Sequence, residues 1–354
     1  MQKKTRLHPD FKLNGQSFSE EALLTFARLE QASDKDYRVS VGDFLVDWLS
    51  ETDSVKVFTS GSTGKPKQII LQKEHMRNSA MATGRFFNLQ SGESALLCLS
   101  AAFIAGKMML VRAMVLGLEL VIVPPSNNPL KDLKENFDFV AMVPLQVTSS
   151  LALLNQVKTL IIGGAPVSKE LREELVVLNT NSFETYGMTE TITHIAAKNL
   201  KESNFFRVLP EVTIDKDQRG CLVVKAPRVS FEVIQTNDMV ELKGSQMFKW
   251  LGRWDNVINS GGIKLIPEVI EEKLKPHIQN RFFLFGVKDE RLGQKLCLLI
   301  EQESVVSKNI IEGIKQHSNL TKFETPKSIY TLAKFVETDT GKVKRQATID
   351  KLFL

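Results

Sequence analysis

Cysteine is scarce in this chain of 354 residues: only Cys98, Cys221 and Cys297 occur, and they stand far apart. Three widely separated cysteines make neither a disulfide framework nor a zinc site, and they indicate a reducing compartment. Four of the five histidines show no metal-ligand spacing, and the fifth, His194, is considered below. These absences exclude a disulfide-rich secreted domain and a zinc-stabilised fold.

Long hydrophobic runs are lacking as well. The longest apolar stretch, residues 111–123, contains Arg112 and Glu119, so it does not predict a transmembrane helix. The N-terminal residues show no apolar run of the length a signal peptide needs. We therefore expect a cytoplasmic protein without stable membrane insertion, and the sequence predicts no particular oligomeric state.

A strong charge of one sign is also missing. The net charge is +5, from 46 basic and 41 acidic residues spread over the whole length. Such mild basicity suits anionic small molecules, but it lacks the basic stripe and interleaved aromatic residues of a nucleic-acid binder. The apolar fraction of 43% and charged fraction of 25% are those of a globular protein, and the length corresponds to about two domains.

Short apolar runs alternate with helical patterns over the first 200 residues. The predicted helices are residues 19–31, 41–49 and 73–87, and the predicted strands are 55–59, 68–71, 95–99, 118–123, 139–143 and 159–162. Continuous apolar runs between helices are typical of buried parallel strands, so the fold class is α/β.

The pattern changes after residue 212. A β meander is predicted at 220–224, 231–234, 239–242 and 247–250, followed by a helix at 267–274. We expect a large domain over residues 1–252, with sheets and a small β-rich part, and a small α+β domain over 253–354.

The most informative segment is Thr59-Ser60-Gly61-Ser62-Thr63-Gly64-Lys65-Pro66-Lys67. Its glycines let the backbone approach an anion, and its hydroxyls and lysines supply further donors, which is what a triphosphate requires. The spacing is not that of a Walker loop, since Pro66 and the strand-like residues 68–71 follow it instead of a helix. A hairpin tip with ordinary turn chemistry is the alternative interpretation.

This segment resembles the phosphate loop of the adenylate-forming family, which includes acyl-CoA synthetases, luciferases and peptide-synthetase adenylation domains. The family's other motifs follow in order. They are matched by Gly163-Gly164-Ala165, Tyr186-Gly187-Met188-Thr189-Glu190, Asp238, Gly252-Arg253-Trp254-Asp255 with Gly261-Gly262 and residues 267–271, and Thr340-Gly341-Lys342-Val343-Lys344-Arg345. The resemblance therefore extends from Val55 to Arg345.

The resemblance implies an enzyme that uses ATP, Mg²⁺ and coenzyme A. It implies that Lys342 bridges the reacting carboxylate and α-phosphate, that Glu190 binds Mg²⁺, and that Gly163, Gly164 and Ala165 form the adenine-side turn. Tyr186, with Gly187 and Thr189 of its motif, would contact adenine, while Asp238 and Arg253 would bind the ribose. Taken singly, these residues have ordinary alternatives, namely a surface glutamate, a core tyrosine, a turn aspartate and an exposed ion pair.

The same resemblance implies that a small mobile domain turns about Asp255 between two half-reactions. One pose would bring Lys342 to the acyl-phosphate, and the other would present Gly261 and Gly262 to the pantetheine channel. In most of the family the phosphate loop lies far later in the chain, so we expect an enzyme with a shortened N-terminal region.

Three features make the chain most similar, within the family, to the compact o-succinylbenzoate–CoA ligases of menaquinone biosynthesis: the short N-terminal region, the Tyr-Gly-Met-Thr-Glu-Thr string that ends at Thr191, and residues 104–109. Ala102 and Phe103 stand where most members have an aromatic residue and a histidine. Lys107 interrupts an apolar helix, so it is a candidate partner for the second carboxylate of the acid, although a snorkelling surface lysine is the alternative. His194 is a second candidate for that pocket, with a structural histidine equally open.

Three further functions remain open at this level. The enzyme activates another aryl or acyl acid, or it passes its adenylate to a carrier protein, or the chain is a catalytically dead nucleotide-binding homologue. The presence of Lys342, Glu190, Asp238 and a full phosphate loop argues against the last of these.

Overall fold

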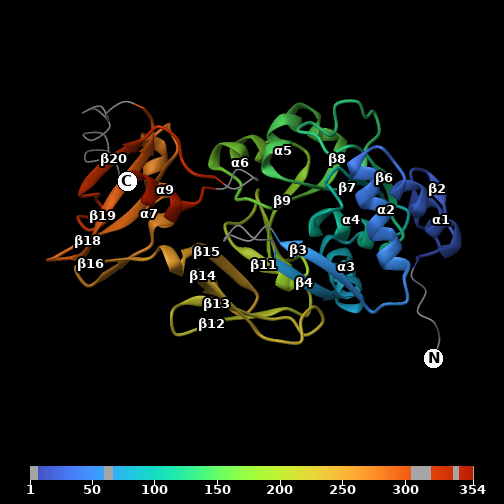
Figure 1. Cartoon of the computed structure of the whole chain (residues 1–354), viewed down its shortest axis with the longest axis horizontal. Coiled ribbons are helices and arrows are strands. Elements are labelled where there is room, and N and C mark those ends of the chain that lie inside the picture. Colours follow the sequence, from blue (N-terminus) through green and yellow to red (C-terminus); the bar gives the residue numbers. More distant parts are fainter. Residues whose placement is uncertain (1–6, 60–66, 304–319, 338–342, 354) are drawn as a thin grey trace.

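The computed structural model describes residues 7–59, 67–303, 320–337 and 343–353. Its helices are α1 (Glu20–Gln31), α2 (Asp36–Leu49), α3 (Lys73–Phe87), α4 (Ile104–Leu116), α5 (Pro144–Ser150), α6 (Lys169–Val176), α7 (Pro267–Leu274) and α9 (Arg345–Leu352). Short 3₁₀ helices are η1 (Leu151–Gln156), η2 (Thr189–Thr191), η3 (Trp254–Asn256) and η4 (Lys275–His277). Figure 1 shows the strands of the C-terminal part set apart from the larger N-terminal part.

A 13-stranded sheet forms the larger part, in the order β12-β13-β14-β15-β11-β10-β9-β8-β7-β5-β6-β1-β2. Its strands are β1 (Lys12–Leu13), β2 (Gln16–Ser17), β5 (Ser94–Leu97), β6 (Glu119–Ile122), β7 (Phe137–Met142), β8 (Val157–Ile162), β9 (Asn181–Gly187), β10 (His194–Asn199), β11 (Phe206–Val208), β12 (Thr213–Lys216), β13 (Cys221–Lys225), β14 (Ile234–Lys243) and β15 (Met247–Arg253). From β9 to β1 the neighbouring strands are parallel, and from β9 to β12 they are antiparallel. The α/β fold class is therefore confirmed.

The parallel half is built from the apolar runs that predicted it. Strands β5, β7 and β8 are almost entirely buried, and the helix α4 between β5 and β6 is buried from Met108 to Met114. A strand covered on both faces needs apolar residues in succession, which is why these segments show no alternation of polar and apolar residues.

Two segments differ from the sequence prediction. Helix α2 begins at Asp36 rather than near residue 41, because Arg38 in its first turn forms an ion pair with Glu30 of α1. The predicted strands 231–234 and 239–242 are wrong as separate elements: one long strand, β14, begins at Ile234, while Ser230 forms a tight side-chain turn with Glu232.

A two-stranded ribbon carries the predicted phosphate loop. Strand β3 (Ser54–Thr59) pairs antiparallel with β4 (Lys67–Gln72), and Thr59 lies opposite Lys67. The residues that flank segment 60–66 are therefore paired, and the segment itself lies outside the described residues. Helix α3 follows directly after β4, as predicted.

A second sheet of five strands lies C-terminal to η3. It consists of β16 (Ile258–Ser260), β17 (Ile263–Leu265), β18 (Phe282–Asp289), β19 (Gly293–Glu301) and β20 (Ser328–Leu332). It has its own buried clusters, which include Leu274 of α7 and Phe335. The predicted division between residues 252 and 253 falls within the last two residues of β15, directly before η3, and it stays a prediction.

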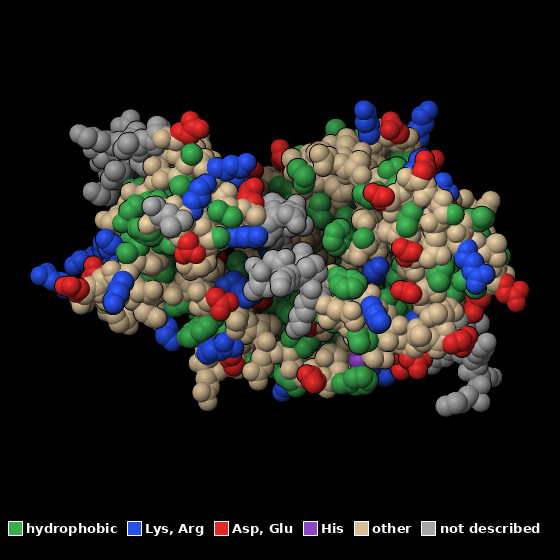
Figure 2. All heavy atoms as spheres, in the orientation of Figure 1, with side chains coloured by type: hydrophobic (Ala, Val, Ile, Leu, Met, Phe, Trp, Pro, Cys, Tyr) green, Lys and Arg blue, Asp and Glu red, His purple; other side chains and the backbone are tan. Residues whose placement is uncertain are grey.

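Two surface features bear on function. Within the described ranges, none of the helices has both the length and the apolar character needed to cross a bilayer. On the face shown in Figure 2, basic and acidic side chains are interspersed.

Candidate active site

Two predicted motifs meet at the carboxyl edge of the parallel strands. Gly163, Gly164 and Ala165 follow β8, and Tyr186 is the penultimate residue of the neighbouring parallel strand β9. Gly164 has a φ of +82°, a conformation that favours glycine, and a Cβ at Gly163 would lie 2.8 Å from Thr185 Oγ1. Because ligands of open α/β sheets bind at this edge, the turn and the end of β9 form a candidate nucleotide site.

A buried carboxylate completes this site from the antiparallel half of the sheet. Asp238 on β14 is 8% exposed. Its Oδ2 accepts a 2.6 Å hydrogen bond from the Tyr186 hydroxyl, and its Oδ1 accepts one of 3.1 Å from Trp250 Nε1. Burial and the Asp238 charge raise the pKa of Tyr186 well above its ordinary value, so the hydroxyl stays protonated and keeps donating. Sequence reasoning predicted Tyr186 and Asp238 but missed Trp250.

Arg253 joins the same cluster at the end of β15. Its Nη1 lies 3.5 Å from Asp238 Oδ1, and its Nη2 donates to Asp255 Oδ2 at 3.0 Å. Burial opposes the charge of Arg253, but the hydrogen bond that it donates to Asp255 and the Asp238 charge outweigh burial and raise the pKa of Arg253. The structure thus brings together Tyr186, Asp238 and Arg253, which lie up to 67 positions apart in the sequence (253 − 186).

The predicted hinge residue, Asp255, is exposed and lies in η3. Besides Arg253, it accepts hydrogen bonds from Asn237 Nδ2 at 3.2 and 3.3 Å. Gly261 and Gly262 form the turn between β16 and β17, with φ values of +60° and +80° that favour glycine. Their part in a thioester-forming pose stays a prediction.

Glu190 lies in η2 and is exposed. The turn before it is fixed, because Thr191 Oγ1 accepts from Met188 N at 2.9 Å, and a Cβ at Gly187 would overlap the backbone of Thr193 and His194. Thr189 lies in the same turn. A single carboxylate of this kind suits a metal that keeps most of its ligands from water and phosphate, as Mg²⁺ does. The described residues hold no group of three or more metal-ligating side chains.

Seven of the predicted phosphate-contacting residues lie outside the described parts of the chain. Ser60, Gly61, Ser62, Thr63, Gly64 and Lys65 lie outside the described residues, as does Lys342, while Thr59 and Lys67 are placed only by their backbone. Glu337 and Val343 form a backbone bridge, so the chain on either side of segment 338–342 is held together.

The two substrate candidates occupy different surroundings. Lys107 Nζ donates to the Ala101 carbonyl at 2.6 Å and lies 5.2 Å from the centre of the Phe44 ring. Burial lowers the pKa of Lys107, against the opposing charges of Asp47 and Asp43. Its ammonium group is therefore already engaged by α2 and by the residues before α4.

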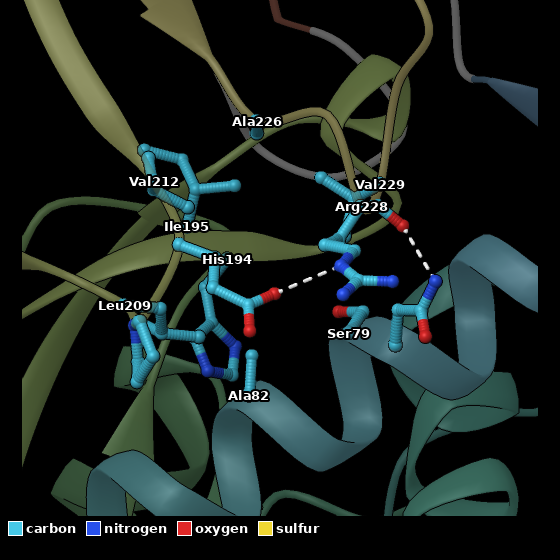
Figure 3. Close-up of a pocket in the computed structure, with 12 residues that line it drawn as sticks. Ser79, Ala82, His194, Ile195, Leu209, Val212, Ala226, Arg228 and Val229 are labelled. Atoms are coloured by element: carbon cyan, nitrogen blue, oxygen red, sulfur yellow. Dashed lines mark hydrogen bonds and ion pairs between the residues drawn. The ribbon is translucent and has the colours of Figure 1, made fainter.

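His194 instead faces Arg112, a residue that the sequence reasoning noted only as an interruption of an apolar run. Arg112 Nη2 lies 3.4 Å from His194 Nδ1 and 3.4 Å from Thr193 Oγ1, and Thr83 Oγ1 lies 3.4 Å from His194 Nε2. Burial and the Arg112 charge lower the pKa of His194 well below its ordinary value, so the ring is neutral. His194 also lines a pocket, in which His194 and Ile195 of β10 face Ser79 and Ala82 of α3 (Figure 3).

Arg112 itself is an unusual core residue. It is 1% exposed, its Nε has no hydrogen-bond partner, its Nη1 lies 3.5 Å from Met109 Sδ, and within the described ranges no carboxylate charge acts on it. Burial lowers the pKa of Arg112 with no opposing charge. An unpaired buried cation costs several kcal/mol, so a functional reason for Arg112 is expected.

Comparison with known proteins identifies the class. The family model described as AMP-binding enzyme matches residues 11–223, which is more than half of the chain. The chain therefore belongs to the AMP-binding enzyme family, and the resemblance found in the motifs is confirmed. In function it is an AMP-forming acid–CoA ligase of that family.

Individual relatives are consistent with this class. A solved acyl-CoA synthetase (AMP-forming)/AMP-acid ligase II-like protein from Dyadobacter fermentans is 37% identical, with a TM-score of 0.63 over 93% of this chain and 98% of that one. A 2-succinylbenzoate–CoA ligase of Bacillus cereus is 25% identical over 330 residues, covering 82% of this chain and 68% of the relative. The fold of o-succinylbenzoate coenzyme A synthetase from Bacillus subtilis, solved with ATP and magnesium ion, matches with a TM-score of 0.72 at 19% identity, over 95% of this chain and 83% of that one.

Proposed function

We propose that this enzyme is an o-succinylbenzoate–CoA ligase acting in menaquinone biosynthesis. A carboxylate oxygen of the acid attacks the α-phosphorus of ATP, and the bond to pyrophosphate breaks, giving an acyl-adenylate. The thiol of coenzyme A then attacks the acyl carbon, loses its proton and releases AMP. The observation that carries the choice of acid is the buried guanidinium of Arg112, which has no carboxylate partner in the described chain.

The first step sets one anion against another, so the site must neutralise charge at the α-phosphate. We assign that task to Lys342 and to the donors of segment 59–67. Glu190 would hold Mg²⁺, which neutralises the triphosphate when bound. The cluster around Asp238 would fix the nucleoside, because its carboxylate accepts from ribose hydroxyls while Arg253 donates to them.

The acid has two carboxylates, of which one reacts and the other must be accommodated. A diacid placed between α3, α4 and β10 would bring the second carboxylate to Arg112, with Thr193 and His194 beside it. Its charge would supply the missing partner of the guanidinium, and a planar bidentate contact suits arginine. Arg112 therefore fits this role better than Lys107, whose ammonium group is already engaged.

The Asp238 assignment gives a first prediction. Asp238→Asn keeps the shape of the side chain but removes its charge, so the KM for ATP should rise about tenfold to a hundredfold in a pyrophosphate-release assay. The KM for the acid should change little. Trp250→Phe is the matched control, since it removes one donor to Asp238 and leaves the carboxylate. A KM for ATP that is unchanged in Asp238→Asn would contradict the ribose-binding role.

The function itself is tested by pyrophosphate release over a panel of acids, each with and without coenzyme A. We expect release with o-succinylbenzoate and ATP, and accumulation of its coenzyme A thioester and AMP once coenzyme A is present. Preference for another aryl or acyl acid would overturn the choice of substrate. Adenylate formation without thioester formation would favour transfer to a carrier protein, and no pyrophosphate with any acid would favour a catalytically dead homologue.

A further inference from the structure

The linker between the two sheets carries an aromatic ring that is contacted by a cation from each sheet. Trp254 opens η3, directly after β15. Lys264 Nζ lies 4.7 Å from the centre of its ring, and Arg219 Cζ lies 5.9 Å from the same ring. Lys264 belongs to β17 of the five-stranded sheet, whereas Arg219 comes from the turn between β12 and β13 of the 13-stranded sheet. One ring on the linker thus joins a cation from each sheet.

The contact on the large sheet is held in place. Arg219 Nε donates to Asp217 Oδ2 at 2.8 Å, and its Nη1 donates to Asn237 Oδ1 at 2.8 Å. Asn237 in turn donates to Asp255, one residue after Trp254. Arg219 is therefore fixed to the large sheet, and it reaches the linker both through the ring of Trp254 and through Asn237.

The contact on the five-stranded sheet comes from the hairpin of β16 and β17. Lys264 is exposed and lies opposite Asn259 in the β16–β17 hairpin, whose turn is formed by Gly261 and Gly262. A rotation about the linker that carries this hairpin away from the β12–β13 turn must separate Trp254 from Arg219 or from Lys264. Each separation has a cost, because a cation over an aromatic face is attracted by the ring quadrupole.

We propose that Arg219, Trp254 and Lys264 form a clasp that positions the five-stranded sheet against the 13-stranded sheet. The three are positioning residues and act through the linker, not on the reacting atoms. The clasp determines what fraction of the molecules leaves the relative arrangement of the two sheets seen here. Its consequence for catalysis rests on the proposed function, because it requires that the two half-reactions use different arrangements of the sheets.

A distance measurement tests the clasp without any substrate. All three native cysteines are buried, so spin labels can be placed selectively at Glu174→Cys on α6 and Lys288→Cys on β18, both exposed positions. In this background, Lys264→Met and Trp254→Leu should raise the population outside the main distance peak by roughly three- to fivefold each, within the range expected for one cation–π contact.

Conservative variants separate the clasp from a general loss of packing. Lys264→Arg and Trp254→Phe keep a cation and a ring face, so they should restore the distance distribution of the parent protein. Lys249→Met on β15 removes the same charge without touching Trp254, and it should leave the distribution unchanged. An unchanged distribution in both Lys264→Met and Trp254→Leu, or an equal shift in Lys249→Met, would overturn the proposal.

The half-reactions supply the second readout. Lys264→Met should change the rate of adenylate formation and the rate of thioester formation from supplied acyl-adenylate by different factors, so that their ratio shifts severalfold. Equal loss of both rates would assign Lys264 a merely structural role. Because the distance measurement needs no activity, failure of the clasp is distinguishable from failure of the proposed function.

Discussion

Replacing Lys342 by alanine is expected to slow adenylate formation by roughly 10³-fold, the scale on which single charge-stabilising donors act. The reason lies in the chemistry, because the attacking carboxylate and the α-phosphate are both anionic. An ammonium group between them is worth far more in the transition state than in the separate reactants. In thioester formation a thiol attacks the acyl carbon of the adenylate, so no carboxylate approaches a phosphate. This second step should therefore retain most of its rate. Pyrophosphate release measures the first step, and consumption of supplied acyl-adenylate with coenzyme A measures the second.

Lys344→Ala is the matched control for this experiment. Lys344 lies two residues further along the same motif, where its backbone N–H donates to the Val336 carbonyl. Its replacement removes the same charge and leaves that backbone bond intact, so both half-reactions should stay near the parent rates. Equal loss of both half-reactions in Lys342→Ala would contradict the assignment of Lys342 to the first step.

The elements that could be predicted from the sequence are those whose boundaries are marked by nearby residues. Helix α3 and helix α7 begin and end where expected, since α3 follows a strand directly and α7 starts at Pro267, a favoured first helical residue. The first turn of α2 was not predictable in this way. Its Arg38 forms an ion pair with Glu30 of α1, a contact that local periodicity does not contain.

The residues of the candidate site likewise fall into two groups, those that belong to a local sequence motif and those that do not. Tyr186, Asp238 and Arg253 were found because each belongs to a motif with recognisable neighbours, and the structure brings them together. Trp250 and Arg112 belong to no such motif. Arg112 was visible only as a charge in an apolar run, and its neighbour His194 lies 82 positions away, so the burial that makes it notable arises from tertiary packing.

Helix geometry explains why Lys107 and Arg112 are not interchangeable. The two lie five residues apart on α4, which places them about 140° apart around the helix axis. Lys107 therefore faces α2 and the Phe44 ring, while Arg112 faces β10. The sequence around this helix gives no reason to prefer Arg112 over Lys107 as the partner of the second carboxylate. The structure supplies that reason through the partners that each cation has.

Arg112→Met should separate the two carboxylates of the acid. Methionine fills much of the same space without charge, and replacing a buried charge with an apolar side chain is often neutral or stabilising, so we expect the folded protein to persist. The value of kcat/KM for o-succinylbenzoate should fall by roughly 10²- to 10³-fold, the effect of losing one partner of a buried charge pair. For an analogue that keeps only the reacting carboxylate, kcat/KM should change little.

Two further variants decide between the cations. Arg112→Lys keeps the charge but loses the planar pair of donors, so its selectivity should lie between those of the parent and Arg112→Met. Lys107→Met removes a cation from the same helix and should leave the preference for the diacid intact. Thermal unfolding of each variant checks that the fold is kept. If Lys107→Met lost the selectivity and Arg112→Met retained it, the second carboxylate would bind at Lys107, and the unpaired charge of Arg112 would have another cause.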